Sequence, residues 1–248
     1  MYKSLYDKFK NWYKTDGVHE NAIWLFSDPH FNDPEANFLR KDYIGDEEQL
    51  KRLNSKIGKH DTVICLGDVG DLNFIKRLKG YKVLIMGNHD KGASNYQRVI
   101  KSERKLFVMP HNKELPYTPE QYDQNEDIRN KVMEDYPGCD YIEIKAVKND
   151  NHLFDEVYEG PLMISDKIVL SHEPLGWDYV LNIHGHDHSS WYVSDKPHIN
   201  LCVELINYTV VSLKSIIESG ILKTLDDIHR VTIDSATKKK ADRKKTNN

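Results

Sequence analysis

The sequence has few cysteines, no long apolar run and no excess of basic residues. Its 248 residues include only three cysteines, Cys65, Cys139 and Cys202, which are widely spaced and form no CxxC pair. This argues against a disulfide framework or a structural zinc site and favours a reducing compartment. Apolar runs such as 83–86 fall far short of the ~18 residues that a membrane span needs. The net charge of −4 gives no overall basic field that would attract nucleic acid or an anionic membrane.

The two ends of the chain are both rich in charge. The first residues, MYKSLYDKFKNWYK, lack the apolar core of a secretory signal, which predicts a cytoplasmic protein. Apolar side chains share one helical face over residues 1–16, so we expect a short helix packed on the domain, with a membrane-surface helix as the alternative. Residues 237–248 read TKKKADRKKTNN and predict a disordered basic tail, for which contact with nucleic acid is the less favoured interpretation.

Short β-branched runs alternate with helical patterns along most of the chain. The expected strands are 23–26, 62–66, 82–86, 167–170, 179–183, 199–203 and 208–211. The expected helices are 46–57, 72–78 and 212–219, and a glycine closes each of them. This rhythm predicts an α/β layered fold.

Residues 111–160 break the rhythm. The stretch 111–137 is polar and acidic, and we interpret Pro116, Pro119 and Pro137 as breakers of regular structure. A long stretch without clear elements is either a lid or binding insertion, or a surface elaboration outside the chemistry. We therefore predict one domain over 1–236, with 111–150 inserted in it. If the acidic segment overhangs a site, it would repel long polyanions.

Five segments carry carboxylate, amide and imidazole groups directly after an expected strand. They are Ser-Asp-Pro-His (27–30), Gly-Asp-Val-Gly-Asp (67–71), Gly-Asn-His-Asp (87–90), Ser-His-Glu (171–173) and His-Gly-His-Asp-His (184–188). Because open α/β sheets bind ligands at the carboxyl ends of their strands, these groups are expected to meet at that edge of a common sheet. Oxygen and imidazole donors suit divalent Mn, Fe, Co, Ni or Zn. The donors are too many for one ion, which favours two ions that share a carboxylate.

In this order, the five segments resemble the calcineurin-like metallophosphoesterase superfamily: Asp-x-His, Gly-Asp-x-x-Asp, Gly-Asn-His-Asp, an isolated His and Gly-His-x-His. The resemblance runs from Asp28 to His188, and residues 199–217 are similar to the closing strands and helix of small prokaryotic and phage members. It implies a four-layer α-β-β-α sandwich with two mixed β-sheets. It also implies a hydrolase with two divalent metal ions, Mn²⁺ being preferred over Fe, Zn, Ni or Co.

The resemblance assigns a role to each motif residue. The implied ligands are Asp28, His30 and His188 for the first ion, Asn88, His172 and His186 for the second, and Asp68 for both. His89 would donate a hydrogen bond to the phosphate or protonate the leaving oxygen, with Asp90 orienting it and raising its pKa. Asp71 would orient a ligand or cap the following helix. His184 is expected either to support a ligand or to face the substrate.

The implied reaction is direct hydrolysis of a phosphate ester by a metal-activated hydroxide, without a covalent intermediate. Leu72 and Asp90 stand where the Ser/Thr protein phosphatases of the superfamily carry Arg and Glu, which disfavours a phosphoprotein substrate. Phosphodiesters, cyclic nucleotides, nucleotide phosphates and nucleic-acid ends remain, and the acidic insertion favours a small substrate. The alternatives are a DNA- or RNA-processing nuclease and a non-catalytic scaffold of the same fold. The sequence predicts no membrane partner and does not indicate an oligomeric state.

Overall fold

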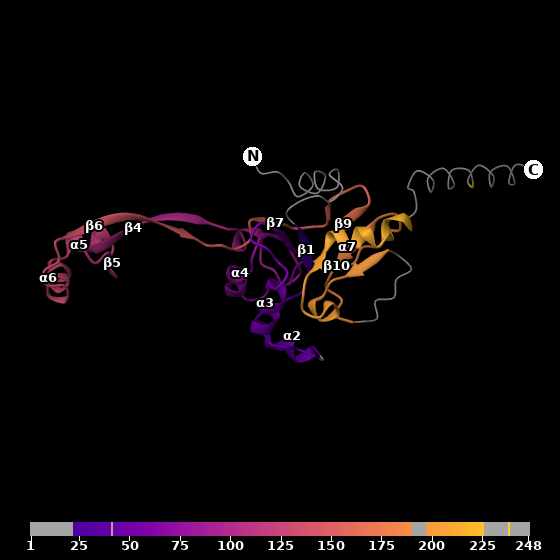
Figure 1. Cartoon of the computed structure of the whole chain (residues 1–248), viewed down its shortest axis with the longest axis horizontal. Helices are drawn as coiled ribbons and strands as arrows, with labels where there is room; N and C mark the ends of the chain where they lie inside the picture. Colours follow the sequence, from indigo (N-terminus) through magenta and orange to yellow (C-terminus); the bar gives the residue numbers. More distant parts are fainter. Residues whose placement is uncertain (1–21, 41, 190–196, 226–237, 239–248) are drawn as a thin grey trace, which may run out of the picture. The chain divides into compact units, whose positions relative to one another are not determined.

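Figure 1 shows the computed structural model of the chain, which describes residues 22–40, 42–189, 197–225 and 238. The expected helix over 1–16 lies outside the described residues, as does the expected tail apart from Lys238. Two compact units make up the chain, one formed by 1–97 with 153–248 and the other by 98–152. The second unit contains the predicted insertion and extends it at both ends. No helix in the described part of the chain is long and apolar enough to cross a membrane.

The first unit contains two mixed β-sheets (Figure 1). The strands of the first sheet are β1 (Ile23–Phe26), β2 (Thr62–Cys65), β3 (Tyr81–Ile85), β7 (Glu156–Tyr158) and β12 (Val211–Ser212). They lie in the order β12-β1-β2-β3-β7, and all neighbours are parallel except β12, which pairs antiparallel with β1. The four-stranded sheet has the order β11-β10-β9-β8, and β8 is antiparallel; its strands are β8 (Leu162–Met163), β9 (Ile168–Leu170), β10 (Leu181–His184) and β11 (His198–Asn200).

Alternation along the strands divides the buried apolar residues between two cores, since successive side chains point to opposite faces. One core lies between the sheets and joins Leu25, Ile64 and Val83 to Leu170 and Ile183. The other covers the opposite face of the first sheet, where the helices pack. There Phe26, Val63 and Leu84 meet apolar residues of α3 (Asp46–Asn54) and α4 (Leu72–Arg77). The predicted α/β fold with two mixed sheets is confirmed.

The remaining elements of this unit are short. They are α2 (Pro34–Leu39), η1 (Ala93–Asn95), η2 (Val203–Ile206), α7 (Leu213–Glu218) and η3 (Ile221–Lys223). The strands expected at 199–203 and 208–211 are wrong in part, because β11 ends at Asn200 and a 3-10 turn follows. Asn207 and Tyr208 adopt positive φ angles of 57° and 54°, which an extended strand does not allow.

The second unit corrects the expectation that 111–137 lacks regular structure. Its elements are β4 (Ile100–Met109), β5 (Lys113–Glu114), α5 (Pro119–Gln124), α6 (Glu126–Asp135) and β6 (Tyr141–Asp150). Thr118 and Gln121 form a reciprocal capping box around Pro119, and Asn125 caps α6. Proline at the first position of a helix begins it rather than breaks it, which is why interpreting Pro119 as a breaker failed.

Candidate metal centre

The parallel strands β1, β2 and β3 end level with one another, and this brings the first three motif segments together. Phe26 pairs with Cys65, and Cys65 pairs with Leu84. Beyond the strands, backbone hydrogen bonds continue the alignment, from the Asp28 amide to the Gly67 carbonyl (3.1 Å) and from the His30 amide to the Asp68 carbonyl (3.0 Å). The segments after β9 and β10 arrive from the second sheet and are joined by a bond from the Gly185 amide to the His172 carbonyl (2.9 Å).

Four of the predicted ligands have left-handed backbone conformations. Their φ angles are 54° at Asp28, 41° at His30, 52° at Asp68 and 67° at His186. Each such non-glycine residue costs on the order of 1 kcal/mol, and this strain is tolerated only where the surroundings enforce it. The packing of the three loops that follow β1, β2 and β10 therefore holds these side chains in place at the expense of stability.

Two glycines allow the loops to approach closely. A Cβ atom at Gly185 would lie 2.0 Å from Oδ2 of Asp28, and one at Gly87 would lie 2.2 Å from Oδ1 of Asp68. Neither carboxylate could keep its place beside any larger residue. The glycines in the Gly-Asn-His-Asp and Gly-His-x-His segments are therefore steric requirements of the site.

A first group of donors surrounds one point between the loops. Nε2 of His30 lies 4.0 Å from Oδ1 of Asp28 and 3.6 Å from Oδ2 of Asp68, and Nε2 of His188 lies 3.6 Å from Oδ1 of Asp28. The Asp28 oxygen and the His30 nitrogen are buried and make no hydrogen bond within the described residues. Because buried polar atoms without partners are costly, their convergence fits a cation held between them.

A second group of donors adjoins the first. Nε2 of His172 lies 3.3 Å from Oδ2 of Asp68, 2.8 Å from Oδ1 of Asn88 and 3.1 Å from Nδ1 of His186. Oδ2 of Asp68 thus belongs to both groups, while its Oδ1 accepts a hydrogen bond from the His89 amide at 2.9 Å. The donor atoms of Asp28, His30 and Asp68 lie within 4.8 Å of one another, as do those of Asp68, His172 and His186. The donor set of carboxylate, amide and imidazole fits divalent cations.

Three of the four histidines in these groups are fixed through their second ring nitrogen. Nδ1 of His30 contacts Asp33 at 3.1 Å, Nδ1 of His188 contacts Glu204 at 2.6 Å, and Nδ1 of His172 contacts the Leu66 carbonyl at 2.9 Å. Metal-binding histidines commonly have such an acceptor, which sets the tautomer and leaves Nε2 free for the ion. The arrangement supplies the orientation that the ligand prediction requires.

The electrostatics of the two groups differ. Burial lowers the pKa of His30, which favours the neutral ring that binds metal. The pKa of His172 is raised to about 9, because its hydrogen bond to Asp68 and the nearby charges of Asp28 and Asp68 outweigh the effect of burial. The hydrogen bond to Glu204 raises the pKa of His188. Protons therefore compete with metal ions most strongly at His172 and His188.

The other predicted site residues lie around these groups. His89 is exposed, and its ring centroid is 5.5 Å from that of His30. Asp71 caps α4 by accepting from the Asn73 amide at 2.9 Å, and within the described residues its carboxylate makes no hydrogen bond to a predicted ligand. His184 is fully buried, with Nδ1 2.8 Å from the Gly185 carbonyl. This burial favours a supporting position for His184 over one that faces the substrate.

The structure gives Asp90 a role that differs from the predicted one. Its carboxylate accepts hydrogen bonds from the backbone amides of Gly87 (2.8 Å), Asp68 (3.0 Å) and Val69 (3.2 Å). Because three amides converge on this carboxyl group, Asp90 joins two motif loops, and within the described residues it makes no hydrogen bond to the His89 ring.

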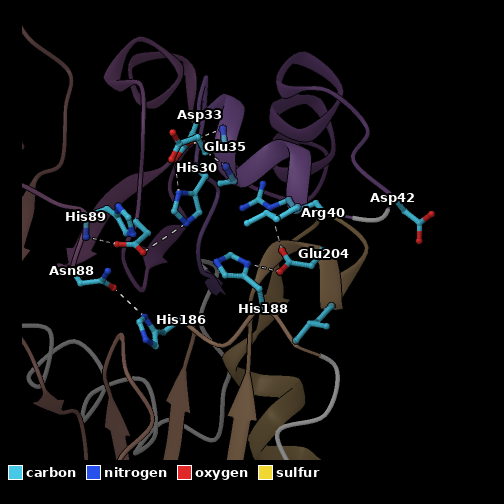
Figure 2. A pocket seen from close by; sticks show the side chains of 14 residues that line it. His30, Asp33, Glu35, Arg40, Asp42, Asn88, His89, His186, His188 and Glu204 are labelled. Atoms are coloured by element: carbon cyan, nitrogen blue, oxygen red, sulfur yellow. Dashed lines mark hydrogen bonds and ion pairs between the residues drawn. The ribbon is translucent and has the colours of Figure 1, made fainter.

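Sequence reasoning missed the residues that support the ligands from outside. Figure 2 shows Asp33 beside His30 and Glu204 between His188 and Arg40. The Arg40 guanidinium donates to the backbone carbonyls of Asp28 and Pro29 and lies 3.6 Å from Glu204. Asp33 follows its histidine by three residues and could have been found from that spacing. Arg40 and Glu204 have no local signal, because only the tertiary structure brings them to the site.

Comparison with protein-family models agrees with this geometry. Residues 22–205 match the calcineurin-like phosphoesterase family. An uncharacterized protein of Methanocaldococcus jannaschii is 32% identical over 111 residues, which are 39% of this chain and 61% of that protein. The chain thus spans about three fifths of the curated relative it matches. The crystal structure of a protein of unknown function from Aquifex aeolicus is 20% identical, with a TM-score of 0.49 over 80% of this chain and 99% of that one. The family match covers most of the chain and all five motif segments, so the chain belongs to the calcineurin-like phosphoesterase family.

Proposed function

We propose that this protein hydrolyses small phosphate esters, either phosphodiesters or nucleotide-type compounds, at a centre of two divalent metal ions. The observation that carries the proposal is the position of Asp68. A single carboxylate oxygen lies 3.6 Å from Nε2 of His30 and 3.3 Å from Nε2 of His172, between two groups of ligating atoms. Family membership supports metal-dependent phosphoester hydrolysis, and the shared carboxylate supports two ions rather than one.

The bound ions would supply a nucleophile near neutral pH and neutralise charge on the phosphoryl oxygens. Asp28, His30 and His188 would hold one ion, while Asn88, His172 and His186 would hold the other. Asn88 contributes a neutral oxygen and so limits the negative charge that faces the phosphate. The donor set suits Mn²⁺, which we propose as the preferred ion over Fe, Zn, Ni or Co.

His89 is the proposed proton donor or hydrogen-bond donor to the leaving oxygen. Its side chain is exposed in the same pocket as the metal ligands, and its amide is bonded to the shared carboxylate of Asp68. This arrangement supports a role for the ring beside the reacting phosphate rather than as a metal ligand. General acid assistance of this kind contributes about 10²–10⁴-fold to a rate.

The buried cysteines support direct hydrolysis without a covalent intermediate. Burial raises the pKa of the Cys65 thiol, and burial together with Asp28 raises that of Cys202. Because the thiolate is the nucleophilic form, neither residue is suited to attack a phosphate. The Cys202 thiol also donates a hydrogen bond to Oδ2 of Asp28, with Sγ and Oδ2 3.4 Å apart.

The test is hydrolysis of bis(p-nitrophenyl) phosphate with added Mn²⁺. Wild-type protein should release p-nitrophenol, EDTA should stop the reaction, and Asp68→Asn should abolish it. Asp187→Asn is the matched control, since that carboxylate lies in the last motif but bonds to the Ser189 amide instead. Activity that persists in EDTA or in Asp68→Asn would refute the proposed centre.

A further inference from the structure

The pocket that contains the predicted ligands also has an apolar side. Its volume is about 580 Å³, and besides His30, Asp68, Asn88, His89, His186 and His188 it is lined by Ala36, Leu39 and Leu205. Leu39 is 81% exposed and Leu205 is 38% exposed. Large apolar side chains left in water beside a charged centre suggest contact with a ligand.

The two leucines are fixed relative to the metal centre by their neighbours in sequence. Arg40, directly after Leu39, is 7% exposed and donates to the carbonyls of Asp28 and Pro29. Glu204, directly before Leu205, bonds to His188 and pairs with Arg40. Figure 2 shows Arg40, Glu204 and His188 next to one another in the pocket. Leu39 therefore precedes a residue that holds the Asp28 loop, and Leu205 follows a residue that contacts His188.

The charges around the apolar side are unfavourable for additional anions. Glu35 and Asp42 are exposed and line the same pocket. Apart from histidines, Arg40 is the cationic side chain among the described lining residues, and its guanidinium is already engaged by two carbonyls and Glu204. A second phosphate or a carboxylate on the substrate would thus meet like charge without a matching cation.

We propose that the substrate is a phosphodiester with one uncharged, apolar ester group, which packs on Leu39 and Leu205 while Glu35 and Asp42 disfavour polyanions. The inference rests on the proposed function, because the phosphate must be held at the metal end of the pocket. In the reaction, a water oxygen bonds to phosphorus, one phosphorus–oxygen ester bond breaks, and the leaving alcohol departs with a proton. The apolar ester group takes no part in these steps and contributes through binding.

The experiment compares three p-nitrophenyl phosphodiesters that share a leaving group and carry a methyl, hexyl or 5-carboxypentyl second ester. With Mn²⁺ present, we expect kcat/KM for the hexyl ester to exceed that for the methyl ester by about tenfold or more, since burial of about two additional methylenes is sufficient. The 5-carboxypentyl ester should lose most of this gain. Equal kcat/KM for the methyl and hexyl esters would overturn the inference.

Variants locate the effect in the pocket. Leu39→Ser and Leu205→Ser should each reduce the ratio of kcat/KM for the hexyl ester to kcat/KM for the methyl ester. Phe38→Ser is the matched control, because Phe38 is 88% exposed and adjoins Leu39 but does not line the pocket among the described residues. An equal loss in Phe38→Ser would contradict the inference, because it would indicate a general apolar surface.

Charge is tested separately. The double variant Glu35→Gln, Asp42→Asn should improve the 5-carboxypentyl ester relative to the hexyl ester by about threefold, an effect that salt reduces. If the ratio of kcat/KM between the 5-carboxypentyl and hexyl esters is unchanged in the double variant, these two residues do not repel an anionic ester group. Failure of every ester, the methyl ester included, to be hydrolysed with Mn²⁺ would instead refute the proposed function, so the two failures are distinguishable.

Discussion

Replacement of Glu204 by glutamine tests whether the contacts behind the ligands control metal binding. Oε1 of Glu204 is 2.6 Å from Nδ1 of His188, and Oε2 is 3.6 Å from Nε of Arg40. The side chains of Arg40 and Glu204 are 2% and 15% exposed, so solvent screens this pair only slightly. Glutamine has the same shape as glutamate but removes the charge that both partners face.

The expected magnitude follows from these contacts. Loss of a carboxylate behind a metal-binding histidine reduces metal affinity by about 10–100-fold, which corresponds to about 1.4–2.8 kcal/mol. The free energy of unfolding without metal should fall by about 1.5–3 kcal/mol, the range for a hydrogen bond to a charged group. Both effects are expected because Glu204 connects His188 to Arg40, which in turn holds the Asp28 backbone.

Isothermal titration calorimetry with Mn²⁺ measures the first effect, and urea unfolding in EDTA measures the second. Glu48→Gln is the control, since Glu48 pairs with Arg52 and Lys51 on an exposed helix surface. That change should leave affinity unaltered and have little effect on stability, because exposed ion pairs contribute little. If Glu204→Gln binds Mn²⁺ within twofold of wild type, the supporting role of Glu204 is refuted.

Three other perturbations have expected outcomes. His89→Ala should keep both metal ions by elemental analysis but lose most turnover, more severely for esters with poor leaving groups; loss of metal would instead make His89 a ligand. Gly185→Ala should lose metal and activity because its Cβ would lie 2.0 Å from Oδ2 of Asp28, and wild-type metal content would contradict the close packing. The pKa of Asp61 lies below its usual 3.8, because hydrogen bonds from Trp24, Gly58 and Ala22 outweigh burial. Its stabilising effect is therefore present above about pH 4 and lost as pH falls through the folded pKa. Urea unfolding of Asp61→Asn should show a deficit of about 1–3 kcal/mol at pH 7 that shrinks below pH 4, whereas a constant deficit would exclude this cause.

Sequence patterns were most reliable where local interactions decide the structure. β1, β2, β3 and the helices α3 and α4 have continuous apolar runs or a helical stripe with clear end signals, and each was predicted to within a few residues. The convergence of the first three motif segments follows from the same strands, because a parallel sheet aligns the strand ends without further information. The convergence of Asp28 and Asp68 could thus be anticipated from the order of elements. The expectation that all donors follow strands of one common sheet was wrong, because His172 and His186 follow β9 and β10 of the second sheet.

Predictions failed where tertiary contacts or special backbone geometry determine the structure. The Asp90 carboxylate is drawn to three amides that face into a turn, which spacing does not reveal. Arg40 and Glu204 pair although 164 positions separate them, so no local pattern connects them. The helices α5 and α6 were missed because prolines were interpreted as breakers without regard to the capping residues Thr118 and Asn125.

The number of Mn²⁺ ions bound per chain tests the central claim most directly. Wild-type protein, equilibrated with Mn²⁺ and freed of excess, should contain two ions per chain, and their electron paramagnetic resonance spectrum should show the magnetic coupling of a close pair. Asp68→Asn should contain fewer ions and lose the coupling, because the oxygen common to both donor groups has been replaced. A single ion in the wild type, or a coupled pair that survives in Asp68→Asn, would contradict the shared carboxylate on which the account depends.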